Sequence, residues 1–181
     1  MLYTRKGDKG DTSFFGSKKR VSKSSCQTEA LGALDEINTL LGICREKAKS
    51  EEIKIKDESV AKILENVQQN LFIIQAAVAG ADKKITQTKI DEIEKIIDSI
   101  EGELPPIKTF FLPGATELSA LLDYARAVSR KTERRVVEQS EKEEISPEIL
   151  QYLNRLSSLL YALVRIVNFK QGIKEIPPSY E

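Results

Sequence analysis

A chain of 181 residues is the size of one ordinary domain and is long enough to bury a hydrophobic core. Its 28 Lys and Arg residues equal its 28 Asp and Glu residues. This balance argues against a general nucleic-acid binder, which needs surplus positive charge. The chain has no His, which excludes His as a general base or metal ligand. Its two cysteines, Cys26 and Cys44, cannot build a zinc site alone or a framework of disulfides.

Neither a membrane span nor an export signal is evident. No apolar run approaches the ~20 residues that a membrane-spanning helix needs. Residues 1–11 are polar and carry both charge signs, unlike a secretory signal or an Arg-rich transit peptide. We therefore expect a cytoplasmic protein that binds neither membrane nor nucleic acid.

The first 25 residues differ from the rest of the chain. They contain Gly7, Gly10 and Gly16 among several Lys and Arg residues, and they show no helical period. We predict a loop segment there, ordered by itself or by a ligand, with a short extended piece at residues 12–15.

Beyond residue 25, apolar residues recur at helical spacing. The periodic stretches are separated by a charged linker at residues 50–57, by the Pro105-Pro106 pair, and by Ser146-Pro147, a cap followed by proline. Helices are predicted at residues 27–47, 58–81, 89–100, 116–139 and 146–170. The predicted fold class is therefore all-α: a single domain built as a five-helix bundle over residues 26–171, with a tail at 172–181.

The fourth predicted helix carries charged residues beside its buried face. Arg126, Arg130 and Glu133 lie on one flank of the apolar stripe, and Lys131 and Arg134 extend the basic surface. At the edge of a core an arginine fork holds phosphate well. The alternative is a solvated face with local Glu–Arg pairs, the commoner role of a charge run. The stripe itself consists of Leu118, Leu122, Ala125, Ser129, Thr132 and Val136.

Two other helices carry a polar residue just off the buried stripe. On the fifth helix, Asn154 could orient a ligand hydroxyl or phosphate, or it could be a satisfied polar residue at a helix boundary. On the first helix, Asp35 follows the core residue Leu34 and could pair with Arg126 of the fourth helix.

The stretch from Thr4 to Thr12, T-R-K-G-D-K-G-D-T, has the chemistry of a phosphate cradle. Glycines let backbone N–H groups point at oxygens, while Lys, Arg and hydroxyl groups add charge and donors. It does not match the G-x-x-x-x-G-K-[ST] motif, and a flexible basic tail is the alternative interpretation.

The loop from Lys108 to Ala115 places Phe110 and Phe111 next to a Pro-Gly turn. Such rings usually anchor a core. In the alternative, one ring projects into a cavity and presses on a flat ligand.

In their order and spacing, these motifs resemble the PduO-type ATP:cob(I)alamin adenosyltransferases, over nearly the whole chain. Each block is modest by itself, but the ordered set is specific. The blocks are Tyr3-Thr4 with Gly7-Asp8-Lys9-Gly10, Glu29-Ala30-Leu31-Gly32, Leu34-Asp35-Glu36, Phe110 to Gly114, Ala125-Arg126, Arg130 with Glu133-Arg134-Arg135-Val136-Val137, and Tyr152-Leu153-Asn154-Arg155-Leu156-Ser157.

The resemblance implies a ferritin-like five-helix bundle that assembles as a homotrimer, with active sites between subunits and the N-terminal segment over the ATP site. It implies transfer of the 5′-deoxyadenosyl group of ATP to the cobalt of cob(I)alamin, with release of triphosphate. ATP, Mg²⁺ carried by the phosphates, and cobalamin as substrate are the expected ligands. A reductase or an adenosylcobalamin-dependent acceptor enzyme is the expected further partner.

The resemblance also assigns roles to residues. Asp35, Arg126, Arg130 and Phe110 become catalytic, with Asp35 and Arg126 as an interhelix pair and Phe110 on the corrinoid side. Lys131 stands where the family often has Arg, and the place of Lys23 could be taken by Lys19 or Arg20. The ATP contacts it implies are Thr4, Arg5, Lys6, Gly7, Thr12, Ser13, Lys23, Arg130, Lys131, Thr132, Glu133, Arg134 and Asn154.

A chain without His suits this chemistry, because cob(I)alamin is itself a strong nucleophile and the cofactor carries the difficult step. The protein must place the ribose C5′ over cobalt, stabilise the departing triphosphate and exclude water. An aromatic wedge at the lower face would remove the axial ligand and ease cobalt reduction. Two other functions are a catalytically silent ATP-binding sensor on the same fold and a purely structural helical module. The complete set of Lys23, Arg126, Arg130 and Arg134, with Asp35 and Phe110, favours the enzyme.

Overall fold

The computed structural model describes residues 3–14 and 16–180 and confirms the five-helix prediction. Within the described residues the helices are α1 (Cys26–Glu51), α2 (Val60–Val78), α3 (Gln87–Glu103), α4 (Glu117–Ser140) and α5 (Pro147–Lys170). Four two-residue strands, β1 (Asp11–Thr12), β2 (Val21–Ser22), β3 (Lys54–Ile55) and β4 (Glu58–Ser59), complete the regular structure.

Side-chain caps fix where α1, α2 and α4 begin. Ser25 accepts a hydrogen bond from the Thr28 N–H at the start of α1. At α4 the two side chains of Thr116 and Ser119 form a reciprocal capping box. Each cap satisfies an N–H group that has no partner inside the helix. The position of α4, which carries most of the candidate site, is therefore specified by its own sequence.

The two antiparallel hairpins differ from the sequence-based expectation. The charged linker at 50–57 forms β3, whose Ile55 is buried, and β3 pairs with β4 so that α2 begins at Val60 rather than at residue 58. In the N-terminal segment, β1 pairs with β2 with Asp11 opposite Ser22. The extended piece expected at 12–15 thus coincides with a strand only at Thr12, and Phe15 lies outside the described residues.

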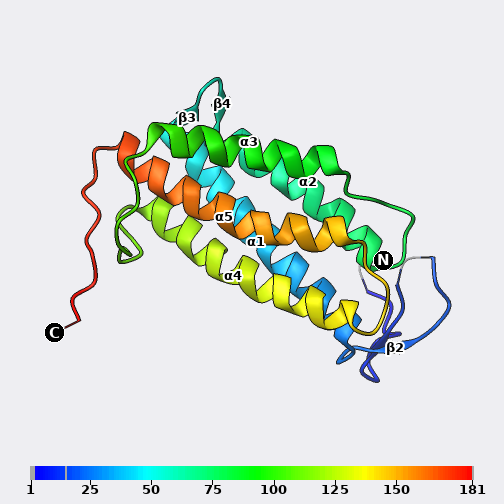
Figure 1. Ribbon diagram of the computed structural model, residues 1–181. Coiled ribbons are helices and arrows are strands. Elements are labelled where there is room, and N and C mark those ends of the chain that lie inside the picture. Colours follow the sequence, from blue (N-terminus) through cyan, green and yellow to red (C-terminus); the bar gives the residue numbers. More distant parts are fainter. Residues whose placement is uncertain (1–2, 15, 181) are drawn as a thin grey trace.

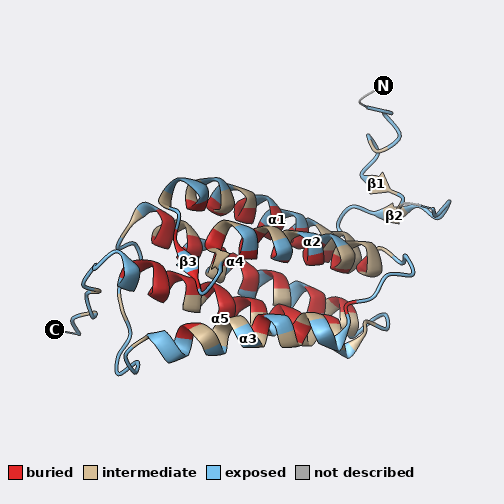
Figure 2. Ribbon diagram, turned by 90° about the horizontal axis from the view of Figure 1, so that it is seen from above, coloured by how far each residue is buried: buried red, intermediate tan, exposed pale blue. Residues whose placement is uncertain are grey.

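The long helices lie side by side, α1 packing on α2 and α4, and α5 packing on α4 and α3 (Figure 1). Buried residues line their inner faces (Figure 2). The N-terminal segment and the C-terminal segment leave the bundle at opposite ends in both views. Among the described residues, no helix is long and apolar enough to cross a lipid bilayer.

The two cysteines have different surroundings, and their reactivity should differ accordingly. Cys44 is fully buried in the core, and burial raises the pKa of its thiol to about 11. Cys26 is half-buried at the start of α1.

The folded protein should therefore react with a disulfide reagent at one thiol, because Cys44 holds about 100-fold less thiolate than an ordinary cysteine. Titration should detect one fast-reacting thiol per chain and a second thiol only in denaturant. Cys26→Ser should remove the fast-reacting thiol. Two equally fast thiols would contradict the packing around Cys44.

Candidate functional site

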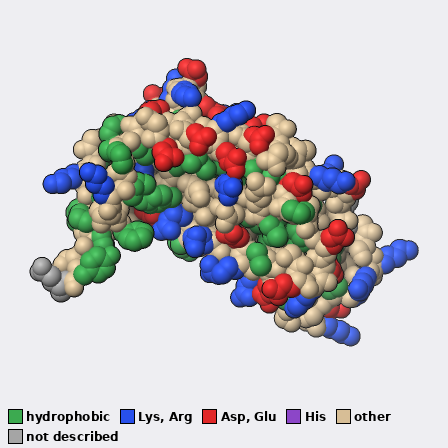
Figure 3. Space-filling model, in the orientation of Figure 1, with side chains coloured by type: hydrophobic (Ala, Val, Ile, Leu, Met, Phe, Trp, Pro, Cys, Tyr) green, Lys and Arg blue, Asp and Glu red, His purple; other side chains and the backbone are tan. Residues whose placement is uncertain are grey.

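Two cavities lie along the seam between α4 and α5. The smaller is a cleft of about 420 Å³ lined by Arg130, Glu133, Arg134, Val137, Glu138, Glu141 and Asn154. The larger is a groove of about 1150 Å³ between α3, α4, α5 and the loop at residues 104–113. Arg130 lines both. Lys and Arg side chains gather over the middle of this face, with a hydrophobic cluster toward the end that bears the C-terminal segment (Figure 3).

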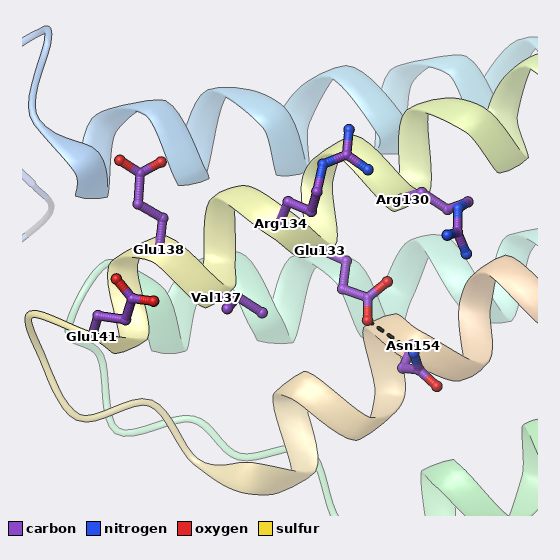
Figure 4. Close-up of a pocket in the computed structure, with 7 residues that line it drawn as sticks. All are labelled: Arg130, Glu133, Arg134, Val137, Glu138, Glu141 and Asn154. Atoms are coloured by element: carbon purple, nitrogen blue, oxygen red, sulfur yellow. Dashed lines mark hydrogen bonds between the residues drawn. The ribbon is translucent and has the colours of Figure 1, made fainter.

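The smaller cleft separates positive from negative charge. Arg130 and Arg134 lie one turn apart on α4, and their side chains make no hydrogen bond or ion pair with any described residue. Glu138 and Glu141 line the opposite end of the cleft (Figure 4). Arg135 donates to Glu138, and this contact lowers the pKa of the Glu138 carboxyl, which keeps that end anionic. A polyanion would therefore lie at the arginine end.

Asn154 joins α5 to α4 across this cleft. Its Nδ2 donates to Oε1 of Glu133 at 2.9 Å, and its Oδ1 accepts from Arg155 at 3.1 Å (Figure 4). The amide thereby orients the Glu133 carboxylate toward the seam and leaves its other oxygen for a ligand. The spacing that placed Asn154 beside the buried stripe of α5 is confirmed, since its neighbours Leu153 and Tyr152 are buried.

The larger groove is bordered by the aromatic loop. Phe110 is 78% exposed at its wall, whereas Phe111 is half-buried with its ring under the guanidinium of Arg165, 4.6 Å from Cζ to the ring centroid. The two rings therefore differ in role: Phe111 is the anchor, and Phe110 is free to contact a ligand. Contact of Phe110 with a corrinoid stays a prediction.

The N-terminal segment has its own internal support. Arg20 pairs with Asp11 and donates to the Lys6 carbonyl at 2.5 Å, and Lys23 donates to the Gly7 carbonyl at 3.0 Å. The Arg20 contact lowers the pKa of the Asp11 carboxyl. Lys19 and Arg20 were the alternatives to Lys23 as the basic residue at the phosphate cradle (residues 4–12). Arg20 is paired with Asp11 and Lys19 is exposed, whereas Lys23 contacts Gly7 of the cradle.

The remaining residues of that segment are mostly exposed. Thr4 Oγ1 accepts from the Lys6 N–H at 3.4 Å, and Arg5 adopts a left-handed backbone conformation with φ of 59°. Thr12 is partly buried and Ser13 is exposed. In Figure 2 the segment projects beyond the end of the bundle, and none of its described residues lines the smaller cleft.

Two of the implied ATP contacts on α4, Lys131 and Thr132, do not line the cleft in this structure. Thr132 is fully buried, and its single hydroxyl proton is shared between the carbonyl oxygens of Ala33 on α1 and of Val128, each 3.0 Å from Oγ1. Lys131 faces α1 and contacts Glu36 at 2.5 Å. The helical wheel placed Thr132 in the core correctly. Its side chain does not line the cleft, and its role as an ATP contact stays a prediction.

The expected Asp35–Arg126 pair is not formed within the chain. Arg126 Nε lies 3.3 Å from Oδ1 of Asp123, three residues earlier on α4, and Asp35 is exposed on α1. The nearer carboxylate satisfies the guanidinium at no cost in loop or helix geometry. Asp123 is itself 9% exposed and lines the larger groove.

A double-mutant cycle tests this assignment. Asp123→Ala and Arg126→Ala should each lower the free energy of unfolding, and together they should fall short of the sum by about 0.5–1 kcal/mol, because the second change removes a contact already lost. Asp123→Ala combined with Arg134→Ala, two turns beyond Arg126, is the additive control. Strict additivity for the first pair, measured by urea unfolding, would show that Asp123 and Arg126 do not interact.

Sequence reasoning missed several lining residues. Glu138 and Glu141 follow Arg134 at four and seven positions, so they share its helical face and could have been found by extending the wheel. Asp123 lies three positions before Arg126 and could have been found in the same way. The burial of Arg165 could not, because it depends on Glu175 of the C-terminal segment, which carries no periodic signal.

A helical bundle with an arginine-lined cleft beside a larger aromatic groove, the two sharing Arg130, suits a class of protein that binds an anionic ligand next to a bulky, partly apolar one. Comparison with known proteins identifies this class. The model of the cobalamin adenosyltransferase family matches residues 2–167, and the chain belongs to that family. The fold and the family expected from the sequence are both confirmed.

Individual relatives agree. The corrinoid adenosyltransferase of Bacillus subtilis is 35% identical over 179 residues, which cover 97% of this chain and 90% of that protein. The human corrinoid adenosyltransferase is 34% identical over 184 residues, covering 96% and 71%. The corrinoid adenosyltransferase PduO of Citrobacter freundii is 37% identical over 171 residues, and the chain spans only 49% of that longer protein.

Solved structures show the same bundle. A variant of the PduO-type ATP:corrinoid adenosyltransferase from Lactobacillus reuteri, complexed with cobalamin and ATP, has 29% sequence identity and a TM-score of 0.87. The match covers 98% of this chain and 99% of that one. Another variant of the same protein, complexed with ATP, gives a TM-score of 0.86.

Proposed function

We propose that this protein transfers the 5′-deoxyadenosyl group of ATP to the cobalt of cob(I)alamin and releases triphosphate. One observation carries the proposal: Arg130 lines both the charged cleft and the larger groove. A group that moves from a polyphosphate to a corrinoid must cross such a boundary. The larger, partly apolar groove suits the bulkier corrinoid, and the cleft suits the nucleotide.

The reaction is a displacement at the ribose C5′. The electron pair of cobalt(I) forms the Co–C bond, the C5′–O bond breaks, and its electrons leave with triphosphate, so that cobalt ends as cobalt(III). Negative charge grows on the departing oxygen, and the unpaired guanidinium groups of Arg130 and Arg134 are placed to stabilise it. Phe110 would press on the lower face of the corrinoid and displace its axial ligand.

Mg²⁺ fits the cleft as a companion of ATP rather than as a metal held by the protein. Within residues 3–14 and 16–180, no group of three or more Cys, Asp or Glu side chains could hold a metal ion. Mg²⁺ needs only one or two carboxylates when substrate phosphates supply the other oxygens. Glu133, oriented by Asn154, is the carboxylate best placed to contribute.

The N-terminal segment is proposed to close over ATP in a homotrimer, where the segment of one copy reaches the cleft of another. Its projection away from the bundle supports this assembly. Thr4, Arg5, Lys6, Gly7, Thr12, Ser13 and Lys23 would then surround the phosphates. A cytoplasmic location, supported only by composition, and a reductase that supplies cob(I)alamin complete the proposal.

The reaction products distinguish transfer from the alternatives. With Mg·ATP and chemically reduced cobalamin under anaerobic conditions, phosphorus NMR should show triphosphate formed in a 1:1 ratio to adenosylcobalamin. ADP and phosphate in place of triphosphate would indicate an ATPase. ATP binding without any turnover would indicate a catalytically silent sensor. If the protein bound no ATP, a structural helical module would be the remaining interpretation.

Limited proteolysis tests the role of the N-terminal segment. Trypsin should cut at residues 5–9 of the free protein, because the side chains of Arg5, Lys6 and Lys9 are exposed and the segment projects from the bundle. At an ATP concentration 100 times its Kd, cleavage should slow by up to about 100-fold if only the opened segment is cut. Asp11→Asn, which weakens the contact with Arg20 without changing a tryptic site, should speed cleavage of the free form. Equal rates with and without Mg·ATP would contradict the proposed closure.

A further inference from the structure

The C-terminal segment at residues 172–180 is tied to the aromatic loop. The Leu112 N–H donates to the Ile176 carbonyl at 2.8 Å, which joins the loop backbone to the segment. The Ile173 N–H donates to the Asn168 carbonyl at 2.9 Å, which returns the segment onto α5. In Figure 1 the loop before α4 and the C-terminal segment lie at the same end of the bundle.

A buried ion pair holds this arrangement. Arg165 of α5 is only 5% exposed, and its Nε lies 2.6 Å from Oε2 of Glu175. The other oxygen of Glu175 accepts from Nδ2 of Asn168 at 3.1 Å. A charge so deeply buried is tolerated only with a partner. Glu175 is the carboxylate that allows the Arg165 guanidinium to lie in the wall of the larger groove.

The same guanidinium lies over the ring of Phe111, 4.6 Å from its centroid. Phe110 and Phe111 are consecutive in a stretch without helical structure, where neighbouring side chains tend to point in opposite directions. Holding Phe111 against Arg165 therefore turns Phe110 outward, where it is 78% exposed at the groove.

We propose that Glu175 is a positioning residue for the corrinoid side of the site: it holds Arg165 on the face of Phe111, and this contact presents Phe110 to the corrinoid. The inference rests on the proposed function but concerns residues that do not touch ATP. Neither Glu175 nor Phe111 lines the nucleotide cleft. Their loss should therefore affect the corrinoid step while ATP binding is preserved.

The test compares two assays on the same variants. In one, cob(II)alamin is the substrate and a flavin reductant supplies one electron, so the axial ligand must be displaced before reduction. In the other, cob(I)alamin is prepared chemically and already lacks a lower ligand. Glu175→Gln keeps the shape but removes the charge. It should lower the cob(II)alamin rate by about 10–100-fold, the usual effect of a misplaced group. The cob(I)alamin rate should change less than about threefold and the ATP Kd less than about twofold.

Three further variants test the proposal independently, in case Glu175→Gln folds poorly. Lys174→Gln changes the adjacent side chain, which has no partner among residues 3–14 and 16–180, and should alter neither assay. Phe111→Leu leaves the Arg165–Glu175 pair in place but removes the flat ring, and should reproduce the split between the assays. Phe111→Tyr keeps the ring and should restore the cob(II)alamin rate.

Three results would overturn the proposal: equal loss in both assays for Glu175→Gln, the same behaviour as Lys174→Gln, or a wild-type ratio of the two rates in Phe111→Leu. Failure of the proposed function would look different. The wild-type protein itself would then form no adenosylcobalamin in either assay.

Discussion

Replacing Arg130 by Ala should weaken ATP binding by about 1.5–3 kcal/mol, the range for a hydrogen bond to a charged group. This loss corresponds to an increase in Kd of about 10–150-fold. Arg130 is exposed and makes no ion pair within the described residues, so removing its guanidinium breaks no contact that stabilises the fold. The melting temperature should therefore stay close to that of the wild type.

Isothermal calorimetry with Mg·ATP measures the effect, and Lys131→Ala is the matched control. Lys131 is the next residue on the same helix, but its ammonium group contacts Glu36 of α1 rather than the cleft. Its removal should change the ATP Kd by less than about twofold, since an exposed pair contributes little. The ATP Kd of Arg130→Lys should lie between those of the wild type and Arg130→Ala, because Lys keeps the positive charge but cannot make two parallel hydrogen bonds. Wild-type affinity in Arg130→Ala would remove this residue from the site.

Phe110→Ala should produce a larger difference between the cob(II)alamin and cob(I)alamin rates than Glu175→Gln does. With cob(II)alamin and a reductant, the rate should fall by about 100-fold, because the ring that displaces the axial ligand is absent. Transfer to chemically prepared cob(I)alamin should suffer much less. The ring is 78% exposed, so the free energy of unfolding should change by less than about 0.5 kcal/mol.

Leu112→Ala is the control for this change, since Leu112 is also exposed in the same loop and its backbone contact with Ile176 is unaffected. It should leave both rates near the wild-type values. If Phe110→Ala instead lowered the free energy of unfolding by about 3–5 kcal/mol, as loss of a buried ring does, Phe110 would be a core residue. Equal damage to both assays would also exclude the wedge.

The helices were predictable because their signals are local. Apolar spacing, the Thr116 cap and Pro147 at the start of α5 act within one or two turns. The wheel of α4 correctly placed Thr132 in the core, although the resemblance assigned it to ATP. Periodicity predicted this burial, since the contact of the Thr132 hydroxyl with Ala33 is decided by the helix face.

The misplaced parts depend on contacts between distant segments. The β3–β4 hairpin forms in a charged linker because Ile53 and Ile55 are buried in the core, and two residues carry too short a pattern to indicate this. Arg165 is buried through contacts with Glu175 of the C-terminal segment and with Phe111 of the aromatic loop, both distant in the sequence. Such tertiary contacts leave no trace in local spacing.

The central claim is that this chain moves an adenosyl group from ATP to cobalt, and the absorbance spectrum of cobalamin reports on it directly. Chemically reduced cob(I)alamin should be mixed anaerobically with Mg·ATP and the purified wild-type protein. We predict conversion to the spectrum of an alkylcobalamin at a rate proportional to protein concentration, dependent on ATP, and reversed to cob(II)alamin by visible light, which breaks the Co–C bond. A cob(I)alamin spectrum that stays unchanged while calorimetry shows that ATP is bound would contradict the claim.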